Sequence, residues 1–444
     1  MGQRVHGLAE RCQADCCDCS LFWQISKSNS GLTNASHPSA TDDAANGADE
    51  LFGGLLAPGG FDRDACLSRH ESPRYYKHSP FAPSPYLLQK LRNYEARHRR
   101  CGPGTPLYAK SVEQLRSGHT SEVMECNYLV LIPYNGLGNR MLSMIASFLY
   151  ALLTDRVLLV HFPDDFTNLF CEPFPGGATA TWVLPLDFPS YGNLLTAKKI
   201  TGDPAKETPL SVPPYVYLHL AHDLRDTDER FYCNDDQLVL AKVNWLLLQR
   251  DLYLVPSLYA IPEFQDELRW LFPAKESVTH LLGRYLLHPS NSVWGMVTRY
   301  YHSYLAPAAE RIGVQIRMFS WASIPIDDMS TSCRTPTETR RRRQDERDRR
   351  TSRHDGHPDR VAAGGLLRQA EVQVLRASGG GWVGVLQPSH EEQQEMGKRG
   401  HNQKALAEIY LLSFSDVLLT SGMSTFGVRE CCIYLLDDPA AFWT

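Results

Sequence analysis

A glycine-rich turn, Gly136-Leu137-Gly138-Asn139-Arg140, stands between an apolar run and a helical pattern, and its residue types suit contact with an anionic ligand. Glycines let the backbone approach a ligand closely, and the N–H groups at a helix N-terminus favour a negative charge. The run lacks the full G-x-G-x-x-G of dinucleotide-binding folds, which argues against a dinucleotide site. Two interpretations remain: Gly136, Gly138, Asn139 and Arg140 face a phosphorylated ligand, or they form a tight turn only.

Two other groups have the chemistry that phosphates require. Arg317 ends a predicted strand, and its guanidinium presents parallel donors that fit a diphosphate and can neutralise charge on a leaving group. Ser424, Thr425 and Phe426 follow another predicted strand, where hydroxyls and N–H groups at a helix N-terminus can hold phosphate. The alternatives are a surface salt bridge for Arg317 and a plain helix N-cap for Ser424 and Thr425.

An acidic run from Asp223 to Asp236 contains Asp226-Thr227-Asp228, a D-x-D of the kind that holds a metal ion in some nucleotide-sugar enzymes. Because three residues in a charged run are a weak signal, we interpret the run as a solvated face and predict no metal site. The sequence contains no H-E-x-x-H, G-x-S-x-G or Walker loop, so nothing in it supports a metalloprotease, a hydrolase or an NTPase.

The elements around the glycine turn predict a Rossmann-like unit. Residues 128–133 form an apolar run of strand length, residues 140–153 have helical spacing, and residues 156–162 form a second apolar run. Strand, glycine turn, helix and strand in this order are typical of the opening of a parallel α/β sheet. Ahead of this unit, the spacing predicts a helix over 84–99.

A second unit follows near the end of the chain. The pattern predicts strands over 312–319, 382–386 and 416–420, with an amphipathic helix over 401–414. The two units together predict an α/β fold of two lobes with a cleft between them.

Composition sets limits on function. The 444 residues are 43% hydrophobic, which is enough to bury one or two cores, and the net charge of -5 argues against the whole chain binding a polyanion. Five of the twelve cysteines, Cys66, Cys101, Cys126, Cys171 and Cys233, are spread through the predicted first lobe, and no pair of C-x-x-C elements has zinc spacing. These cysteines fit either disulfides of the secretory pathway or buried thiols.

No apolar run is long enough to span a bilayer, and the first twenty residues lack the apolar core of a signal peptide. We therefore expect a soluble chain with no visible transmembrane anchor. Residues 1–49 are polar and aperiodic, which predicts a disordered tail.

Residues 333–378 have a different composition from their surroundings, with four consecutive arginines at 340–343, no lysine and almost no aromatic residue. Three interpretations are open: a polyanion-binding patch, a solvated insertion, or a stretch translated from the wrong reading frame, which we favour. Without interleaved aromatic residues the segment lacks the stacking platforms of single-stranded nucleic-acid binders, so we expect no nucleic-acid partner.

Longer segments of the chain carry a specific pattern. They include Gly-Leu-Gly-Asn-Arg-Met-Leu-Ser (136–143), Leu-Phe-Cys-Glu-Pro-Phe-Pro-Gly (169–176), Val-Pro-Ser-Leu (255–258), Gln-Pro-Ser-His-Glu-Glu (387–392) and Lys-Ala-Leu-Ala-Glu-Ile-Tyr-Leu-Leu-Ser-Phe-Ser-Asp-Val (404–417). In these motifs the chain resembles the plant xyloglucan fucosyltransferase family, the galactoside 2-alpha-L-fucosyltransferases of glycosyltransferase family 37. The resemblance runs over 50–332 and again over 382–427.

The resemblance implies a GT-B-like fold, in which two Rossmann-like lobes hold donor and acceptor in the cleft between them. It also implies an inverting, metal-independent galactoside alpha-(1,2)-fucosyltransferase that uses GDP-fucose as donor substrate and needs no cofactor. The implied acceptor is a galactose on xyloglucan or on an arabinogalactan protein. The implied location is the Golgi membrane, with a homodimer or a Golgi glycosyltransferase complex as the expected assembly.

By motif position, the resemblance also implies residue roles. Arg317 matches the family's donor-diphosphate arginine, Ser424, Thr425 and Phe426 match its C-terminal nucleotide loop, and Gly138 to Arg140 match the loop of the first lobe that faces the donor. Asp251 matches an aspartate ahead of Val-Pro-Ser-Leu and is the candidate for acceptor orientation or acid/base catalysis.

The resemblance also implies a division of the chain into segments. We expect a non-family tail over 1–49, an acceptor-side lobe over 50–310, a GDP-sugar lobe over 311–427 and a second non-family tail over 428–444. Residues 333–381 depart from the family pattern, so we expect an incomplete C-terminal lobe with impaired activity, because an uncovered sheet edge destabilises a lobe. The alternatives are a non-catalytic paralogue that binds glycan or a partner glycosyltransferase, and an Arg-rich polyanion binder with steep salt dependence.

Overall fold

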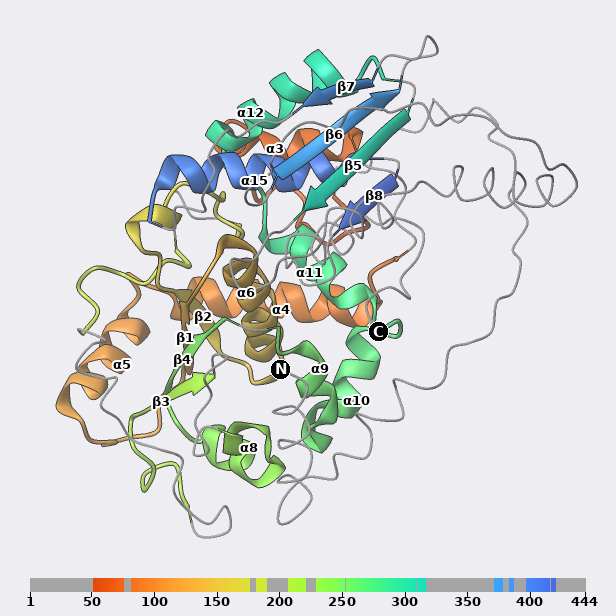
Figure 1. Ribbon diagram of the computed structural model, residues 1–444. Coiled ribbons are helices and arrows are strands. Elements are labelled where there is room, and N and C mark those ends of the chain that lie inside the picture. The colour runs from red at the N-terminus through yellow and green to blue at the C-terminus, as the bar shows by residue number, and fades with distance from the viewer. Residues whose placement is uncertain are drawn as a thin grey trace, which may run out of the picture.

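The structure is a computed structural model (Figure 1). It describes residues 51–75, 81–175, 181–189, 207–220, 229–251, 253–308, 310–316, 371–377, 383–386, 397–415 and 417–420. Every structural statement below refers to these ranges.

The first sheet has four parallel strands in the order β2-β1-β4-β3. The strands are β1 (Tyr128–Pro133), β2 (Val157–Val160), β3 (Tyr215–Leu220) and β4 (Trp245–Arg250). In the register of the sheet, Tyr128 lies opposite both Val157 and Trp245. The Rossmann-like opening predicted from the sequence is therefore confirmed.

Helices and helical turns account for most of the remaining described chain in this region. They are α3 (Leu67–Glu71), η2 (Ser72–Arg74), α4 (Pro85–Cys101), α5 (Pro106–Ser117), α6 (Leu137–Leu153), η3 (Asp164–Phe166), η4 (Glu229–Tyr232), α8 (Asn234–Leu240), α9 (Val255–Ala260), α10 (Pro262–Leu271), α11 (Ser277–Leu286), α12 (Asn291–Tyr300) and the π-helical turn η5 (Tyr301–Leu305). The predicted helix over 84–99 is α4, which Ser84 caps by accepting a hydrogen bond from the N–H of Leu87. None of the helices in the described ranges has both the length and the apolarity that crossing a bilayer requires.

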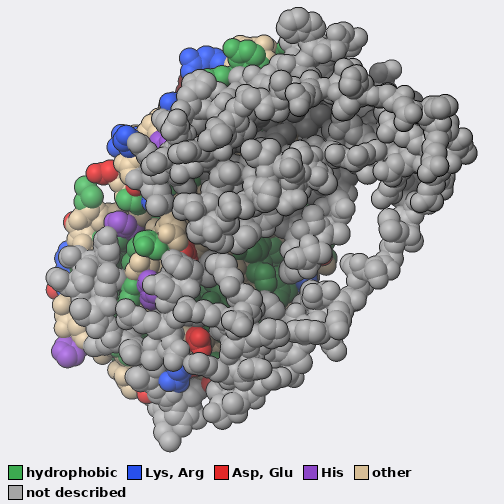
Figure 2. Space-filling model, in the orientation of Figure 1, with side chains coloured by type: hydrophobic (Ala, Val, Ile, Leu, Met, Phe, Trp, Pro, Cys, Tyr) green, Lys and Arg blue, Asp and Glu red, His purple; other side chains and the backbone are tan. Residues whose placement is uncertain are grey.

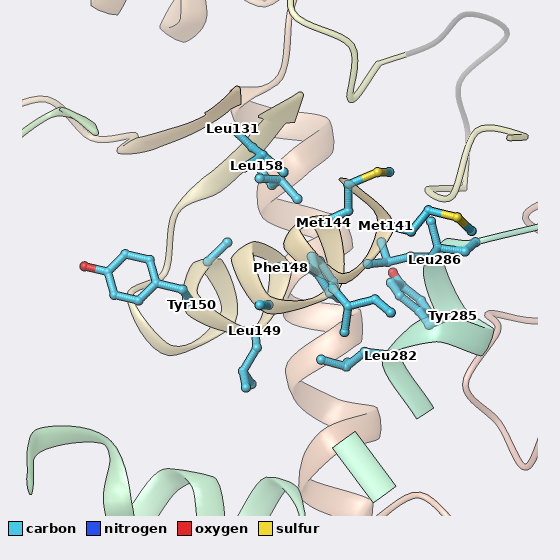
Figure 3. Packing of buried hydrophobic residues seen from close by; sticks show 14 of the residues in the cluster. Leu131, Met141, Met144, Phe148, Leu149, Tyr150, Leu158, Leu282, Tyr285 and Leu286 are labelled. Carbon is cyan, nitrogen blue, oxygen red and sulfur yellow. The ribbon is translucent and has the colours of Figure 1, made fainter. Parts of the chain in front are cut away.

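Helix α6 is the centre of the largest apolar cluster. Fifteen of its seventeen residues are buried, because the sheet covers one side of it and helices α4 and α11 contact the other. Phe148 stacks on Tyr285 of α11 with ring centroids 5.5 Å apart, as the close-up in Figure 3 shows. This burial fixes α6, and with it the turn at its N-terminus, against the sheet.

Strands β1 and β2 and nearly all of β4 are buried on both faces, as expected when helices cover a parallel sheet, whereas every second residue of the edge strand β3 is only partly buried. Alternate residues belong to two separate clusters, with Leu129 and Leu246 on the α6 side and Val130 and Leu247 on the other. On this second face, the rings of Tyr128 and Trp245 stack 4.1 Å apart at the start of β1 and β4.

The second sheet has the strand order β7-β6-β5-β8. Its strands are β5 (Glu310–Ile316), β6 (Glu371–Ala377), β7 (Val383–Leu386) and β8 (Val417–Thr420). β5 and β8 are parallel, but β6 pairs antiparallel with both β5 and β7, so this sheet is mixed and not the all-parallel sheet of a Rossmann unit. The antiparallel strand lies inside 333–381, the segment whose departure from the family pattern led us to expect an incomplete C-terminal lobe. A short alternation of polar and apolar residues, Glu371-Val372-Gln373-Val374, was the signal for it.

Helix α15 (Arg399–Ser413) connects the two halves of the structure. It contacts β5 and β6 of the second sheet and also α12, η3 and α6 of the first half (Figure 1). The hydroxyl of Tyr410 donates to the carbonyl of Leu287, and Gln403 Nε2 donates to Ser292 Oγ at 3.3 Å. The helix predicted over 401–414 is thus confirmed, but it is not amphipathic, because every residue from Ala405 to Leu412 is buried. It docks the C-terminal sheet onto the first lobe.

Two disulfides join segments of the first lobe, Cys66–Cys171 and Cys101–Cys126. For these four cysteines the disulfide interpretation is confirmed over that of buried thiols. The longer bridge closes a separation of 105 residues and ties the segment around α3 to the motif 169–176.

Arg156 holds the amino ends of the central strands together. It is 1% exposed, and its guanidinium donates to the carbonyls of Tyr128 (3.1 Å), Asn244 (3.3 Å), Leu240 (2.6 Å) and Val243 (2.8 Å). These carbonyls belong to the start of β1, the end of α8 and the turn before β4. A single buried side chain therefore donates to four backbone carbonyls, of which those of Leu240 and Asn244 also accept a backbone N–H.

We expect Arg156→Met to lower the free energy of unfolding by about 3 kcal/mol, because it removes four buried hydrogen bonds to backbone carbonyls. The measurement is urea unfolding of the oxidised protein. Arg269→Met is the matched control, since the Arg269 side chain is 67% exposed beside Asp266 and should change stability by less than about 1 kcal/mol. Equal losses in the two variants would contradict this role for Arg156.

Glu172, next to the Cys66–Cys171 disulfide, is a partly buried carboxylate that accepts several hydrogen bonds. It accepts hydrogen bonds from the N–H of Thr181 (2.6 Å), from Thr181 Oγ1 (3.0 Å) and from the N–H of Phe174 (3.3 Å). Burial raises the pKa of Glu172 from its usual 4.5 to about 7, although these hydrogen bonds act in the opposite direction.

The raised pKa predicts a pH dependence of stability. The folded state holds the Glu172 proton more tightly than the unfolded state does, so its stabilising contribution is complete below pH 4.5 and is lost as pH rises through about 7. We expect Glu172→Gln to flatten the fall of unfolding free energy over this interval, measured by urea unfolding at a series of pH values. Glu113→Gln, at a side chain that is 77% exposed, should leave the slope unchanged. Parallel curves for Glu172→Gln and wild type would show that the prediction is wrong.

Candidate active site

The candidate site lies at the carboxyl ends of β1 and β4. From β1 the chain passes through α6 to β2 on one side, whereas β4 and β3 lie on the other side of β1. The strand order thus reverses between β1 and β4. In open α/β sheets ligands bind outside the carboxyl ends of the strands at such a switch point, since the loops there diverge and leave a crevice.

The loop after β1 is short and leads directly into α6. Asn135 has a left-handed backbone with φ 66°, a conformation that asparagine tolerates better than most residues. Gly136 is the N-cap of α6 and provides no capping side chain. Gly138 and Asn139 lie in the first helical turn and not in the turn before it, because α6 begins at Leu137 and not at residue 140 as predicted. The uncapped N-terminus of a long helix therefore points to the switch point, where it favours an anion.

Asp251 follows β4 at the same edge of the sheet. Its side chain is 2% exposed, and Oδ2 accepts a hydrogen bond from Nδ2 of Asn135. The N–H of Tyr134 donates to the carbonyl of Arg250 at 2.9 Å and so continues the pairing of the two strands to the edge of the site. The structure thus brings the predicted Asp251 next to the glycine turn.

The electrostatics around Asp251 include a buried cation. Arg250 is 1% exposed, and burial lowers its pKa to about 10, while Tyr232 and Asp251 act in the opposite direction. Arg250 therefore remains charged at neutral pH beside the carboxylate. Burial also raises the pKa of Tyr232, so its hydroxyl stays neutral.

Arg140, predicted to face the donor, makes contacts within the protein. Its Nε donates to the carbonyl of Asn135 at 2.6 Å, and its Nη1 lies 2.7 Å from Oδ2 of Asp165. The guanidinium also lies over the ring of Phe166, 5.5 Å from its centroid. The Arg140 side chain is only 12% exposed, and its contacts stabilise the glycine turn from the protein interior.

Asp165 links this turn to α15. Its Oδ2 accepts from Arg140 and from Nδ2 of Asn402 (2.9 Å), and Asn402 also donates to the carbonyl of Asp165 at 3.0 Å. Next to it, Arg399 Nε donates to the carbonyl of Asp164 at 3.2 Å. The sequence analysis missed Asn135, Asp165 and Asn402. Of the three, only Asn135 carried a signal, as an asparagine ahead of a glycine.

The remaining predicted residues lie outside the described ranges. They are Arg317, Ser424, Thr425, Phe426 and the D-x-D at 226–228. Their roles, and the cleft between the lobes, stay predictions. Within the described ranges no group of three or more His, Cys, Asp or Glu side chains is arranged to hold a metal ion.

A surface groove of about 710 Å³ lies at the other end of the first sheet. Its lining includes Thr105, Tyr108, Arg116 and Asp187, and Tyr108 packs against Tyr128 and Trp245, which begin β1 and β4. Since ligands of parallel sheets bind at the carboxyl ends, this groove lies away from the expected chemistry.

The comparisons with known proteins identify the family. A family model described as xyloglucan fucosyltransferase matches residues 24–353 and 374–433. The chain belongs to this family. A galactoside 2-alpha-L-fucosyltransferase of Pisum sativum is 45% identical over 402 residues, 85% of this chain and 69% of the relative. A galactoside 2-alpha-L-fucosyltransferase of Arabidopsis thaliana is 47% identical over 405 residues, which are 86% of this chain and 70% of the relative.

A solved structure supports the fold of this fucosyltransferase family member. A point mutant of Arabidopsis thaliana FUT1 in complex with GDP matches with a TM-score of 0.70 and 42% identity, over 87% of this chain and 85% of that one. The family predicted from the motifs and the GT-B-like α/β fold class are both confirmed. The family match extends beyond 50–332 and 382–427 on both sides, and its internal gap, 354–373, falls inside the Arg-rich segment 333–381.

Proposed function

We propose that the chain transfers L-fucose from GDP-fucose to a galactose of a plant cell-wall glycan, xyloglucan or arabinogalactan, with inversion at the sugar carbon and without a metal ion. The observation that carries this proposal is the position of Asp251. A buried carboxylate stands at the switch point of the first sheet, next to the N-terminus of α6, in a chain of fucosyltransferase descent.

Each residue has a defined part in this reaction. The acceptor hydroxyl attacks the anomeric carbon of fucose on the face opposite the diphosphate, and Asp251 accepts or orients the hydroxyl proton. The bond between the anomeric carbon and the diphosphate oxygen breaks, and GDP leaves with the bonding electrons. Arg317, together with Ser424, Thr425 and Phe426, binds the leaving nucleotide, and the N-terminus of α6 adds positive potential.

Tyr134 fits an acceptor sugar. It is 44% exposed, and it directly precedes Asn135 at the end of β1. An exposed aromatic ring at this edge of the sheet is suited to stack on the apolar face of a hexose while its hydroxyl hydrogen-bonds.

We infer that the protein acts in the Golgi lumen. The Cys66–Cys171 and Cys101–Cys126 disulfides support this, because disulfides persist in oxidising compartments of the secretory pathway.

Two variants should separate binding from chemistry. We expect Arg317→Ala to raise the Kd for GDP at least about 30-fold, since a charge-assisted contact to the diphosphate is lost. We expect Asp251→Asn to lower kcat by about 100-fold or more while the Kd for GDP changes less than about twofold. The measurements are GDP calorimetry and fucose transfer to a galactosylated xyloglucan oligosaccharide.

Arg299→Ala is the control for charge removal, because Arg299 is an exposed residue of α12 that bonds only within its helix. A folded wild-type chain that binds GDP without transferring fucose would instead support a non-catalytic paralogue. Full activity of Asp251→Asn would refute the assigned role.

A further inference from the structure

A continuous chain of polar contacts joins helix α15 to Asp251. It runs from Asn402 to Asp165, from Asp165 to Arg140, from Arg140 to Asn135 and from Asn135 to Asp251. We call these four residues, Asn402, Asp165, Arg140 and Asn135, the relay. They come from three segments of the chain: the turn and start of α6, the turn η3, and α15.

Burial makes the relay sensitive to its geometry. Asn402 is 3% exposed, Asp165 is 6% exposed and Asp251 is 2% exposed. A buried carboxylate without its partners carries a large desolvation cost, so Asp165 holds both the Arg140 guanidinium and the Asn402 amide in place. If Asn402 moves, Asp165 loses one of these donors at Oδ2 and Arg140 is no longer held in a single position.

Arg140 transmits the position of Asp165 to the turn. Its Nε donates to the carbonyl of Asn135 at 2.6 Å, so the guanidinium spans from η3 to the left-handed residue of the turn. The side chain of that same residue donates to Asp251. The position of the carboxylate therefore depends on a backbone conformation that Arg140 stabilises.

Helix α15 is the element to whose position the relay is sensitive. It contacts β5 and β6 of the second sheet, and it leads to β8, the strand ahead of the proposed nucleotide loop. Its Asn402 side chain reaches across to η3 of the first lobe.

We propose that the relay couples the docking of the C-terminal lobe to the orientation of Asp251, so that the acceptor-side carboxylate is aligned only when α15 is seated on the first lobe. This inference rests on the proposed function, in which Asp251 acts on the acceptor and the C-terminal lobe binds the donor. Asn402, Asp165, Arg140 and Asn135 are then positioning residues for fucose transfer.

The test measures kcat, KM and the Kd for GDP in Asn402→Ala, Asn135→Gly and the double variant. Asn135→Gly keeps the left-handed backbone accessible and removes only the side chain. We expect kcat to fall about tenfold in each single variant, since a small misplacement of a reacting group is costly, while the Kd for GDP changes less than about twofold. Because both variants break one relay, the double variant should lose little more than the worse single one.

Two control variants distinguish a positioning role of the relay residues from a general effect on the structure. Gln403→Ala removes a neighbouring α15 contact to Ser292 that is not part of the relay, and we expect its kcat to stay within about twofold of wild type. Asn135→Asp keeps the size and the tolerance for a left-handed backbone but cannot donate, so we expect its kcat to be no better than that of Asn135→Gly. Near-wild-type kcat in Asn135→Asp would leave only a backbone role for Asn135 and overturn the proposal.

The outcomes distinguish the relay from the function it serves. If Asp251→Asn is inactive but Asn402→Ala behaves like Gln403→Ala, or if the losses of the two single variants multiply in the double variant, the relay is wrong and the proposed function stands. If the wild-type chain transfers no fucose, or if Asp251→Asn keeps full activity, the proposed function fails and the relay has no catalytic role.

Discussion

The arrangement around the site depends on how one buried carboxylate, Asp165, is paired. A charge in an interior of low polarity is tolerated only with matched partners, and Asp165 receives a guanidinium from α6 and an amide from α15. These two partners fix three elements relative to one another: the helix behind the glycine turn, the short turn η3, and the helix that carries the second sheet. Because α6 is itself buried along nearly its whole length, the contacts of Asp165 act on a helix that packing already holds in place, and not on a mobile loop.

Much of the fold could be predicted from the sequence, since β1, α6, β2, α4 and α15 have clear apolar periodicity and lie close to their predicted bounds. The start of α6 was placed three residues late, because glycines at 136 and 138 indicate a turn in isolation, whereas burial against the sheet stabilises the helix through Gly138. Strand β6 was missed because its short alternation follows an arginine-rich stretch that has no pattern of its own. Its antiparallel pairing with β5 depends on long-range hydrogen bonds that local patterns do not encode.

The residue types of the site could be predicted from the sequence, but the hydrogen bonds and ion pairs between them could not. Asp251 and the glycine turn could be selected from the motifs of the family, and the parallel register of β1 with β4 explains why they meet. Arg140 was assigned to the donor as part of the glycine turn and by motif position, and the structure adds a buried carboxylate 25 residues further along the chain as its partner. Asn402 lies far from both in sequence, so only the tertiary structure shows that it completes the same network. The assignments of Arg317 and of Ser424, Thr425 and Phe426 still depend on motif position.

The central claim is that this chain, with its unusual segment at 333–381, carries out GDP-fucose-dependent transfer. The most direct test incubates the purified, oxidised chain with GDP-fucose and a galactosylated xyloglucan oligosaccharide, and follows the product by mass spectrometry and the new linkage by NMR. We expect an oligosaccharide that carries one added fucose, joined to galactose with inverted configuration. A cooperatively folded chain that leaves the oligosaccharide unmodified, or that forms product with retained configuration, would contradict it.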